Sequence, residues 1–197
     1  MSRSTLARTD DQLIAEAAAG NRDAFGELYE RYAVRVFRHS YFLTGDPGLA
    51  EDLTAQTFLN ALEAIPRYEH RGVPFAAWLL RIACNLAINY KKAPKNNSHA
   101  QLPEGLEAED SLSSPERCCV AKDDGERVWE DVRKLSPDQR QVIVMRFLDD
   151  LGYQDIAAVM GKSVGAVRVI QFRALTNLRH IMQDEADEVG YALARAG

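Results

Sequence analysis

The sequence predicts an all-α protein of two small helical domains joined by an acidic flexible linker. Apolar residues recur at helical spacing through almost the whole chain, and helix-start signals precede most of these stretches. The periodicity stops between residues 95 and 120, where polar, acidic and helix-breaking residues gather. We therefore expect a first domain over residues 10–94, a linker over residues 95–120 and a second domain over residues 121–184.

Caps mark the first two helices of the first domain. Thr9-Asp10-Asp11-Gln12 has the form of a capping box and opens a short helix that Gly20 ends. Asn21 then caps a long helix from about residue 22 to residue 43. The apolar stripe of this helix is predicted to face the core and consists of Phe25, Leu28, Tyr32, Val36 and Leu43.

Prolines mark the next two helices. Pro47 follows a Gly45-Asp46 turn and suits the first position of a third helix, which Pro66 stops. Pro74 opens a fourth helix, which ends before Pro94. Trp78 in this helix is expected to belong to the core. The predicted core stripe of the third helix is Leu49, Leu53, Phe58, Leu62 and Ile65.

The second domain is also predicted to be helical throughout. Ser114-Pro115 restarts a helix that continues to about Lys134, and Ser136-Pro137-Asp138-Gln139 forms a second capping box. From residue 135 to residue 179 the pattern predicts two helices followed by a helix-turn-helix. The tail after Asp184 is expected to continue as a frayed polar helix.

The helix-turn-helix rests on a few residues at fixed spacing. Ala157 is small enough for two helices to cross closely, Gly161 suits a turn with positive φ, and Val167 supplies an apolar plug. Ser163 is placed to cap the second helix. The full charges from Gly161 onward to residue 181 are all positive: Lys162, Arg168, Arg173 and Arg179. This combination indicates duplex DNA as the ligand, with an ordinary helical hairpin carrying a solvated basic face as the alternative.

The net charge of −5 does not argue against nucleic acid, because the negative charge is concentrated in one stretch. Residues 103–131 carry ten acidic and three basic residues, a net charge of −7, so the remainder of the chain is mildly basic. An acidic middle therefore masks two domains that can approach phosphates.

Several classes of protein are excluded by what the sequence lacks. No apolar run approaches the roughly 20 residues of a membrane span, and the N-terminus has no apolar signal core, so we expect a cytoplasmic protein. Cys84, Cys118, Cys119 and the scattered histidines form no metal-binding pattern, and no cofactor is expected. No Walker loop, HExxH or GxSxG motif is present, which predicts that the protein is not an enzyme. Chance exposure or a redox role remain alternatives for Cys118 and Cys119.

From about Asp10 to Arg179 the chain resembles the sigma-seventy family of bacterial transcription initiation factors, and specifically its compact extracytoplasmic-function group. Four passages carry the resemblance: residues 23–62, residues 74–92, the acidic linker and residues 135–179. The resemblance implies that the partners are promoter DNA, core RNA polymerase through its clamp helices and flap region, and an anti-sigma factor that silences the protein. It implies two DNA-reading domains held at fixed spacing by the polymerase.

The passage AEDLTAQTFLNAL, residues 50–62, resembles the helix that grips the polymerase clamp helices. Its polar, partly acidic face could hold a partner helix by charge-assisted hydrogen bonds. A plain solvated face is the alternative. The polymerase-binding candidates are Glu51, Asp52, Gln56 and Asn60.

The passage PFAAWLLRIACNLAINYKK and the loop before it resemble the part of the family that melts and reads the minus-ten element. Melting requires a place for unstacked bases and cations near the backbone, and the loop and helix offer both. The minus-ten candidates are Arg67, Tyr68, His70 and Arg71 in the loop, and Arg81, Asn85, Asn89 and Lys92 in the helix.

The segment from residue 135 to residue 179 resembles the domain that binds the minus-thirty-five element. Arg168 and Gln171 are the base-edge candidates, because Arg and Gln can make bidentate contacts to guanine and adenine. Ala166 stands where the family often has Thr, and Ile170 where Arg is common, so the promoter sequence cannot be copied from relatives. The full minus-thirty-five set is Lys162, Ser163, Val164, Arg168, Gln171, Arg173 and Arg179, of which Lys162, Arg173 and Arg179 are assigned to phosphates.

Two further alternatives stay open. The acidic linker lies where the family threads a connector through the polymerase near the RNA exit path, and it could instead be a solvated spacer. For the whole chain, the alternative to an initiation factor is a one-component regulator, in which a helical ligand-sensing domain precedes the same helix-turn-helix.

Overall fold

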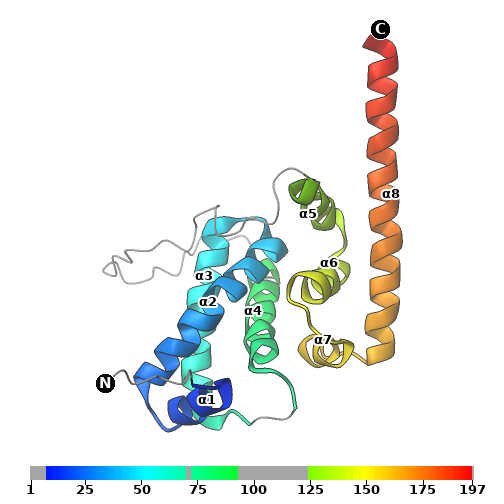
Figure 1. The fold of residues 1–197 in the computed structure, drawn as a ribbon. Coiled ribbons are helices and arrows are strands. Elements are labelled where there is room, and N and C mark those ends of the chain that lie inside the picture. The colour runs from blue at the N-terminus through cyan, green and yellow to red at the C-terminus, as the bar shows by residue number, and fades with distance from the viewer. Residues whose placement is uncertain (1–7, 70–71, 93–123, 197) are drawn as a thin grey trace, which may run out of the picture.

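The computed structural model describes the backbone of residues 8–69, 72–92 and 124–196, and the side chains of residues 8–69, 72–90 and 128–184. Every regular element within these ranges is helical, so the predicted all-α fold is confirmed (Figure 1). The predicted linker and the predicted helix restart at Ser114-Pro115 lie outside the described residues. The domain boundaries at residues 94, 95, 120 and 121 stay a prediction.

The first domain is a bundle around one long helix. Its elements are α1 (Asp10–Ala18), α2 (Arg22–Thr44), α3 (Pro47–Ala64), the short 3₁₀ helix η1 (Ile65–Arg67) and α4 (Phe75–Lys92). Helix α2 packs against α1, α3 and α4. The predicted caps are present: Thr9 and Gln12 form the capping box of α1, and the Asn21 side chain accepts hydrogen bonds from two backbone N–H groups of α2.

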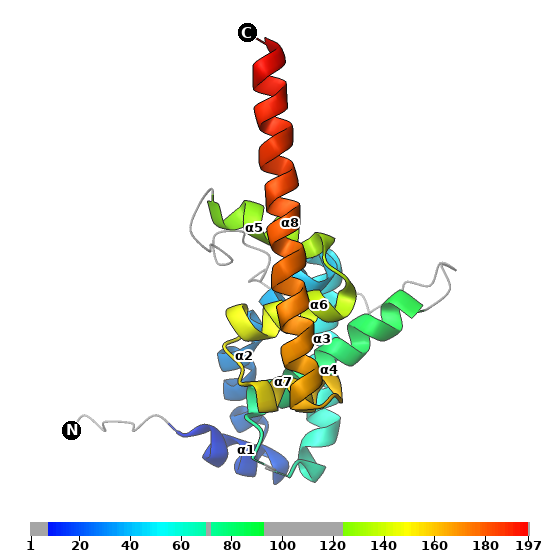
Figure 2. The same cartoon turned by 90° about the vertical axis from the view of Figure 1, so that its right-hand side faces the viewer.

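The second domain comprises α5 (Asp124–Lys134), α6 (Pro137–Ile143), the π-helical turn η3 (Val144–Leu148), α7 (Tyr153–Met160) and α8 (Val164–Ala196). Figures 1 and 2 show α8 on the outside, with α6 and α7 between it and the first domain. Helix α8 continues without a break through the tail after Asp184. The buried apolar residues of both domains form one cluster, because α2 and α4 also pack against α7, η3 and α6.

Three sequence predictions about these elements are wrong in detail. Ser136 makes no side-chain capping bond to α6, and the Gln139 side chain instead accepts a hydrogen bond from Asn177 at 3.2 Å. Leu62 is 45% exposed, because the buried stripe of α3 passes through its neighbour Ala61. In place of two helices ahead of the helix-turn-helix, α6 passes directly into η3, since no glycine or proline interrupts the chain between Pro137 and Gly152.

The described residues contain no helix that is both long enough and apolar enough to cross a bilayer.

Replacing Gly161 by alanine should lower the free energy of unfolding by about 1–2 kcal/mol, because the left-handed backbone brings Cβ close to a carbonyl oxygen. Gly161 has φ of 63°, and a Cβ added there would meet no atom within 4 Å, so the cost lies in the backbone alone. Urea unfolding followed by circular dichroism measures the change.

Gly26 is the matched control, because it lies within α2 and a Cβ added there would also meet no atom within 4 Å. Gly26→Ala should stabilise the protein by about 0.5–1 kcal/mol. Equal losses at both glycines would contradict the assigned role of the turn.

Candidate nucleic-acid interface

The helix-turn-helix is formed by α7 and α8, and the sequence signals act as predicted. Gly161 ends α7 in the left-handed region, and the Ser163 hydroxyl oxygen accepts a hydrogen bond from the Ala166 N–H at 3.2 Å. Ala157 and Val167 are both buried, Val167 completely. The turn, the cap and the apolar plug therefore fix the direction in which α8 leaves α7.

The outward face of α8 is apolar along its centre and basic along its edges. At about 100° per residue, Gly165, Val169, Phe172 and Thr176 fall on one stripe, opposite the buried Val167 and Ala174. Phe172 is 72% exposed and Val169 is 49% exposed. The exposed arginines beside this stripe are Arg168, Arg173 and Arg179.

The side chain of Arg168 lies against an aromatic ring of the preceding helix. Its guanidinium carbon is 5.1 Å from the centroid of the Tyr153 ring, and that of Arg146 is 5.2 Å from the same centroid. Arg146 also donates a hydrogen bond to the Leu151 carbonyl at 2.9 Å, which fixes it beside the start of α7. The distance between the Arg168 guanidinium and the Tyr153 ring is typical of a cation–π interaction, so Tyr153 limits the positions that the Arg168 side chain can take.

Three other predicted minus-thirty-five residues, Lys162, Val164 and Gln171, are only partly available to DNA. The Lys162 ammonium lies 3.1 Å from an Asp138 carboxylate oxygen, and half-buried Val164 packs against the core cluster. The Oε1 atom of Gln171 is buried and has no hydrogen-bond partner. Gln171 therefore lies at the side of α8, between the outward stripe and the core.

The predicted minus-ten residues of α4 form one exposed line. Arg81, Asn85 and Asn89 are all exposed and follow each other at four-residue intervals, so their side chains share a face. The side chain of Lys92 lies outside the described residues, as do His70 and Arg71.

The loop before α4 holds its tyrosine in a ring cluster. Tyr68 lies edge-on to Phe75 at 5.5 Å and to Trp78 at 4.8 Å between ring centroids. Burial, with the nearby Asp11 carboxylate, raises the pKa of Tyr68. Trp78 packs against the core, as expected, and is only half-buried. Arg67 is exposed at the end of η1, and Gly72 adopts a positive φ of 74°.

The predicted polymerase-binding residues lie on α3, where two leucines join them. Gln56 donates a hydrogen bond to the Asn60 side chain at 2.8 Å, and Asp52 is exposed. Glu51 is half-buried, with one carboxylate oxygen that is buried and has no hydrogen-bond partner. Leu59 and Leu62 are 49% and 45% exposed, which gives this helix an apolar component that the sequence reasoning missed.

Sequence reasoning also missed Tyr153, Val169 and Phe172. The periodicity of α8 contained the signal for the last two, because they fall outside the stripe of Val167, Ile170 and Ala174 that faces the core. Tyr153 precedes Arg168 by fifteen positions on another helix, and no local pattern connects them.

Two family models match the chain: Sigma-70 region 2 over residues 28–96, and Sigma-70, region 4 over residues 132–180. The ECF RNA polymerase sigma factor BldN of Streptomyces coelicolor is 37% identical over 175 residues, which make up 89% of this chain and 66% of BldN. The chain thus spans just under two thirds of BldN. The ECF RNA polymerase sigma factor SigD of Mycobacterium tuberculosis is 34% identical over 176 residues, 86% of this chain and 82% of SigD.

The structure of CnrH in complex with the cytosolic domain of CnrY matches with a TM-score of 0.66 at 26% identity, over 89% of this chain and 97% of CnrH. Together the matches define a bacterial transcription initiation factor. The chain belongs to the sigma-70 family, in its extracytoplasmic-function group, and the predicted function in promoter-directed initiation by RNA polymerase is confirmed. The alternative of a one-component regulator is set aside.

Proposed function

We propose that this chain binds core RNA polymerase through α3, reads the minus-thirty-five element with α8 and captures the unpaired minus-ten strand with α4. The observation that supports the proposal is the presence of two separate exposed surfaces suited to DNA, one on α8 and one on α4. In this proposal the protein has no catalytic activity of its own and works in the cytoplasm, where the polymerase and the chromosome are. An anti-sigma factor that covers the α3 surface would silence it.

The experiment that tests this proposal adds the protein to sigma-free core polymerase and sequences the transcripts started on genomic DNA from its host. Discrete start sites that share two upstream motifs are expected. Footprinting of a palindrome by the protein alone, without specific initiation, would instead indicate a regulator that binds operators as a dimer.

For the upstream element, we propose that Arg168 contacts a base edge while Val169 and Phe172 contact thymine methyl groups. Arginine makes bidentate contacts to guanine, and apolar side chains contact the methyl group that only thymine carries in the major groove. Both types of group lie on the outward face of α8. Lys162, Arg173 and Arg179 position the helix on phosphates, with Asp138 competing for Lys162.

Arg168→Ala should weaken holoenzyme binding by about 1–3 kcal/mol and relax specificity at one upstream base pair. Arg179→Ala is the charge-matched control. It should weaken binding to all sequences alike, and it should reduce by about 1 the slope of the logarithm of the binding constant against the logarithm of the salt concentration. Selection of upstream sequences from a randomised promoter library distinguishes the two results. Because Tyr153 holds Arg168, Tyr153→Leu should give a weaker form of the Arg168 result, whereas Tyr153→Phe should not.

For the downstream element, we propose that the line of Arg81, Asn85 and Asn89 binds the unpaired strand. The amides can hydrogen-bond base edges, and Arg81 can contact the backbone or stack on a base. Tyr68 and Trp78 lie beside the N-terminal end of α4 and offer half-buried rings to a flipped base.

The double variant Asn85→Ala/Asn89→Ala should weaken holoenzyme binding to a forked promoter with an unpaired minus-ten strand by about 1–3 kcal/mol, because each lost hydrogen bond costs about 0.5–1.5 kcal/mol. Binding to duplex DNA that carries only the upstream element should not change. Glu30→Gln, an exposed change on α2, is the control. Equal losses on both DNAs would place these asparagines outside the minus-ten contact.

For the polymerase, we propose that Leu59 and Leu62 provide the apolar centre of the contact and that Asp52, Gln56 and Asn60 form its polar rim. Exposed apolar side chains that neighbour polar groups on one helix face are typical of protein interfaces. Glu51 can offer a partner only one carboxylate oxygen, because the other oxygen is buried.

Leu59→Ala and Leu62→Ala should each weaken binding to core polymerase by more than about 1 kcal/mol, as expected for residues at an interface centre. Both side chains are exposed, so the fold should tolerate the changes. Fluorescence titration with core polymerase measures the affinity. Val34→Ala removes a comparably exposed apolar side chain from α2 and should leave binding unchanged; a similar loss there would contradict the assignment.

A further inference from the structure

A buried cysteine of α4 belongs to a chain of three titratable side chains. His39 Nδ1 of α2 lies 2.6 Å from Asp149 Oδ2, and His39 Nε2 lies 3.2 Å from Cys84 Sγ. The side chains of His39 and Asp149 are completely buried, and Cys84 is buried as well. One imidazole therefore joins a carboxylate to a thiol, which is the arrangement that proteins use to activate a sulfur nucleophile.

The charge on His39 suits this arrangement. Burial lowers the pKa of His39, but the Asp149 carboxylate and the Cys84 sulfur more than offset this effect, and the pKa is raised to about 10. At neutral pH both ring nitrogens therefore carry protons, so Nε2–H donates to the Cys84 sulfur. A cation beside a cysteine favours the thiolate, which is the nucleophile in thiol chemistry. Because desolvation disfavours a lone buried charge, the thiolate depends on the His39 cation beside it.

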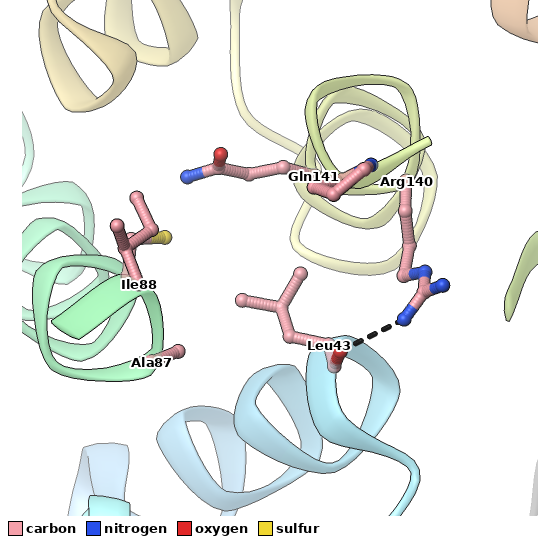
Figure 3. Close-up of a pocket in the computed structure, with 7 residues that line it drawn as sticks. Leu43, Ala87, Ile88, Arg140 and Gln141 are labelled. Atoms are coloured by element: carbon pink, nitrogen blue, oxygen red, sulfur yellow. Dashed lines mark hydrogen bonds between the residues drawn. The ribbon is translucent and has the colours of Figure 1, made fainter. Parts of the chain in front are cut away.

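Cys84 also lines a small pocket between α4 and α6 (Figure 3). The pocket has a volume of about 40 Å³, whereas a water molecule requires roughly 10–15 Å³. Ile88, another lining residue, is 42% exposed, so the pocket reaches the surface of the protein. The other residues that line it are Leu43, Ala87, Pro137, Arg140 and Gln141. A molecule of a few atoms can therefore reach the sulfur from solvent.

Gln141 of α6 gives this pocket a polar group without a partner. The residue is only 8% exposed, and its side chain extends from α6 toward Ile88 of α4 (Figure 3). Its amide makes no hydrogen bond with any residue that the structure describes. The neighbouring Arg140, by contrast, donates a hydrogen bond to the Leu43 carbonyl at 3.0 Å. An enclosed amide without a partner is uncommon in folded proteins, so it points to a small hydrogen-bonding molecule in the pocket.

The size and chemistry of the pocket together select one class of molecule. A thiolate with a proton donor beside it reacts with disulfides, alkylating agents and peroxides. A volume of about 40 Å³ excludes disulfides and most alkylating agents, but it admits hydrogen peroxide, which has two heavy atoms. Hydrogen peroxide is also uncharged, and it can exchange hydrogen bonds with the Gln141 amide.

We propose that Cys84, with His39 beside it and Gln141 across the pocket, is an oxidation site for hydrogen peroxide. The thiolate attacks one peroxide oxygen, so that an S–O bond forms and the O–O bond breaks. The electron pair of the O–O bond goes to the second oxygen, which takes the proton from His39 Nε2 and leaves as water. The sulfur is oxidised to a sulfenic acid and the peroxide is reduced, so the step needs no other reactant. The Gln141 amide hydrogen-bonds the new oxygen. This modification is independent of the proposed contacts with DNA and polymerase.

The reaction should show a selectivity that neither an inert buried thiol nor an exposed thiol has. In the folded full chain at pH 7, Cys84 should react with hydrogen peroxide faster than in the urea-unfolded chain. The ratio should reach up to about 30-fold, because an ordinary thiol is only about 3% ionised at that pH. N-ethylmaleimide, which is too large for the pocket, should react more slowly with the folded chain than with the unfolded chain. Peptide mass spectrometry reads both reactions at Cys84 separately from Cys118 and Cys119.

Peroxide oxidation that is no faster in the folded chain would overturn the proposal. Equal rates of reaction with N-ethylmaleimide in the folded and unfolded chains would overturn the selection by the pocket.

Two variants test the neighbours of the sulfur. His39→Gln keeps a polar side chain but removes the charge and the transferable proton, so the peroxide rate should fall to that of the unfolded chain or below it. Gln141→Leu should slow the reaction by about two- to tenfold, because one hydrogen bond to the reacting oxygen is lost. Thr57→Val is the matched control, because Thr57 is a buried polar residue of α3 whose hydroxyl donates to the Leu53 carbonyl of the same helix. It should leave the rate unchanged.

Circular dichroism establishes whether each variant folds. Folded His39→Gln and Gln141→Leu variants that react like the wild type would overturn the assigned roles of both side chains. If His39→Gln does not fold, Gln141→Leu and the comparison of the two reagents on the wild type still decide the proposal.

Discussion

The structure depends on the burial of α2 from two sides. Its apolar residues Leu28, Val36 and Leu43 face a core shared with α1, α3 and α4, and its polar residues Arg35, Arg38 and His39 face the second domain. A helix enclosed in this way cannot shift without disturbing both domains. The placement of α3 and α4 follows from their packing on this one helix, and so does the position of α6 and η3 beside the first domain.

Most of the fold could be predicted from the sequence because its signals are local. Thr9, Asn21 and Ser163 act through backbone groups two or three residues away, and Gly161 acts through its own φ. The errors come from competition that is not local. Ser136 has the spacing of a capping box, but its partner Gln139 is engaged by Asn177 from α8. Leu62 is apolar like a core residue, but the rotation of α3 points Ala61 into the core and leaves Leu62 exposed.

The sequence could predict which helices carry the candidate residues, but it could predict only part of how these residues contact one another. The residue types on α3, α4 and α8 predict that these helices contact polymerase and DNA, and that assignment stays a prediction. The pairing of Arg168 with Tyr153 depends on how α7 crosses α8, and the pairing of His39 with Asp149 joins residues 110 positions apart. Neither pairing leaves a recognisable pattern in a single sequence. The same holds for Gln171, whose residue type suits adenine although its amide oxygen is buried beside the core.

Helix α8 has a mechanical consequence beyond recognition. It is one unbroken helix of 33 residues, about 50 Å long, and only its first turns belong to the helix-turn-helix (Figure 2). Residues as far as Ile181 still pack on the core, and the part of the helix beyond them projects past the domain as a stiff arm (Figure 1). A molecule that took hold of the distal end would tilt the recognition turns about their contact with α6 and α7, with the advantage of a long lever. A force or a steric block at the distal end of α8 would thus change the orientation of the turns that are proposed to contact DNA.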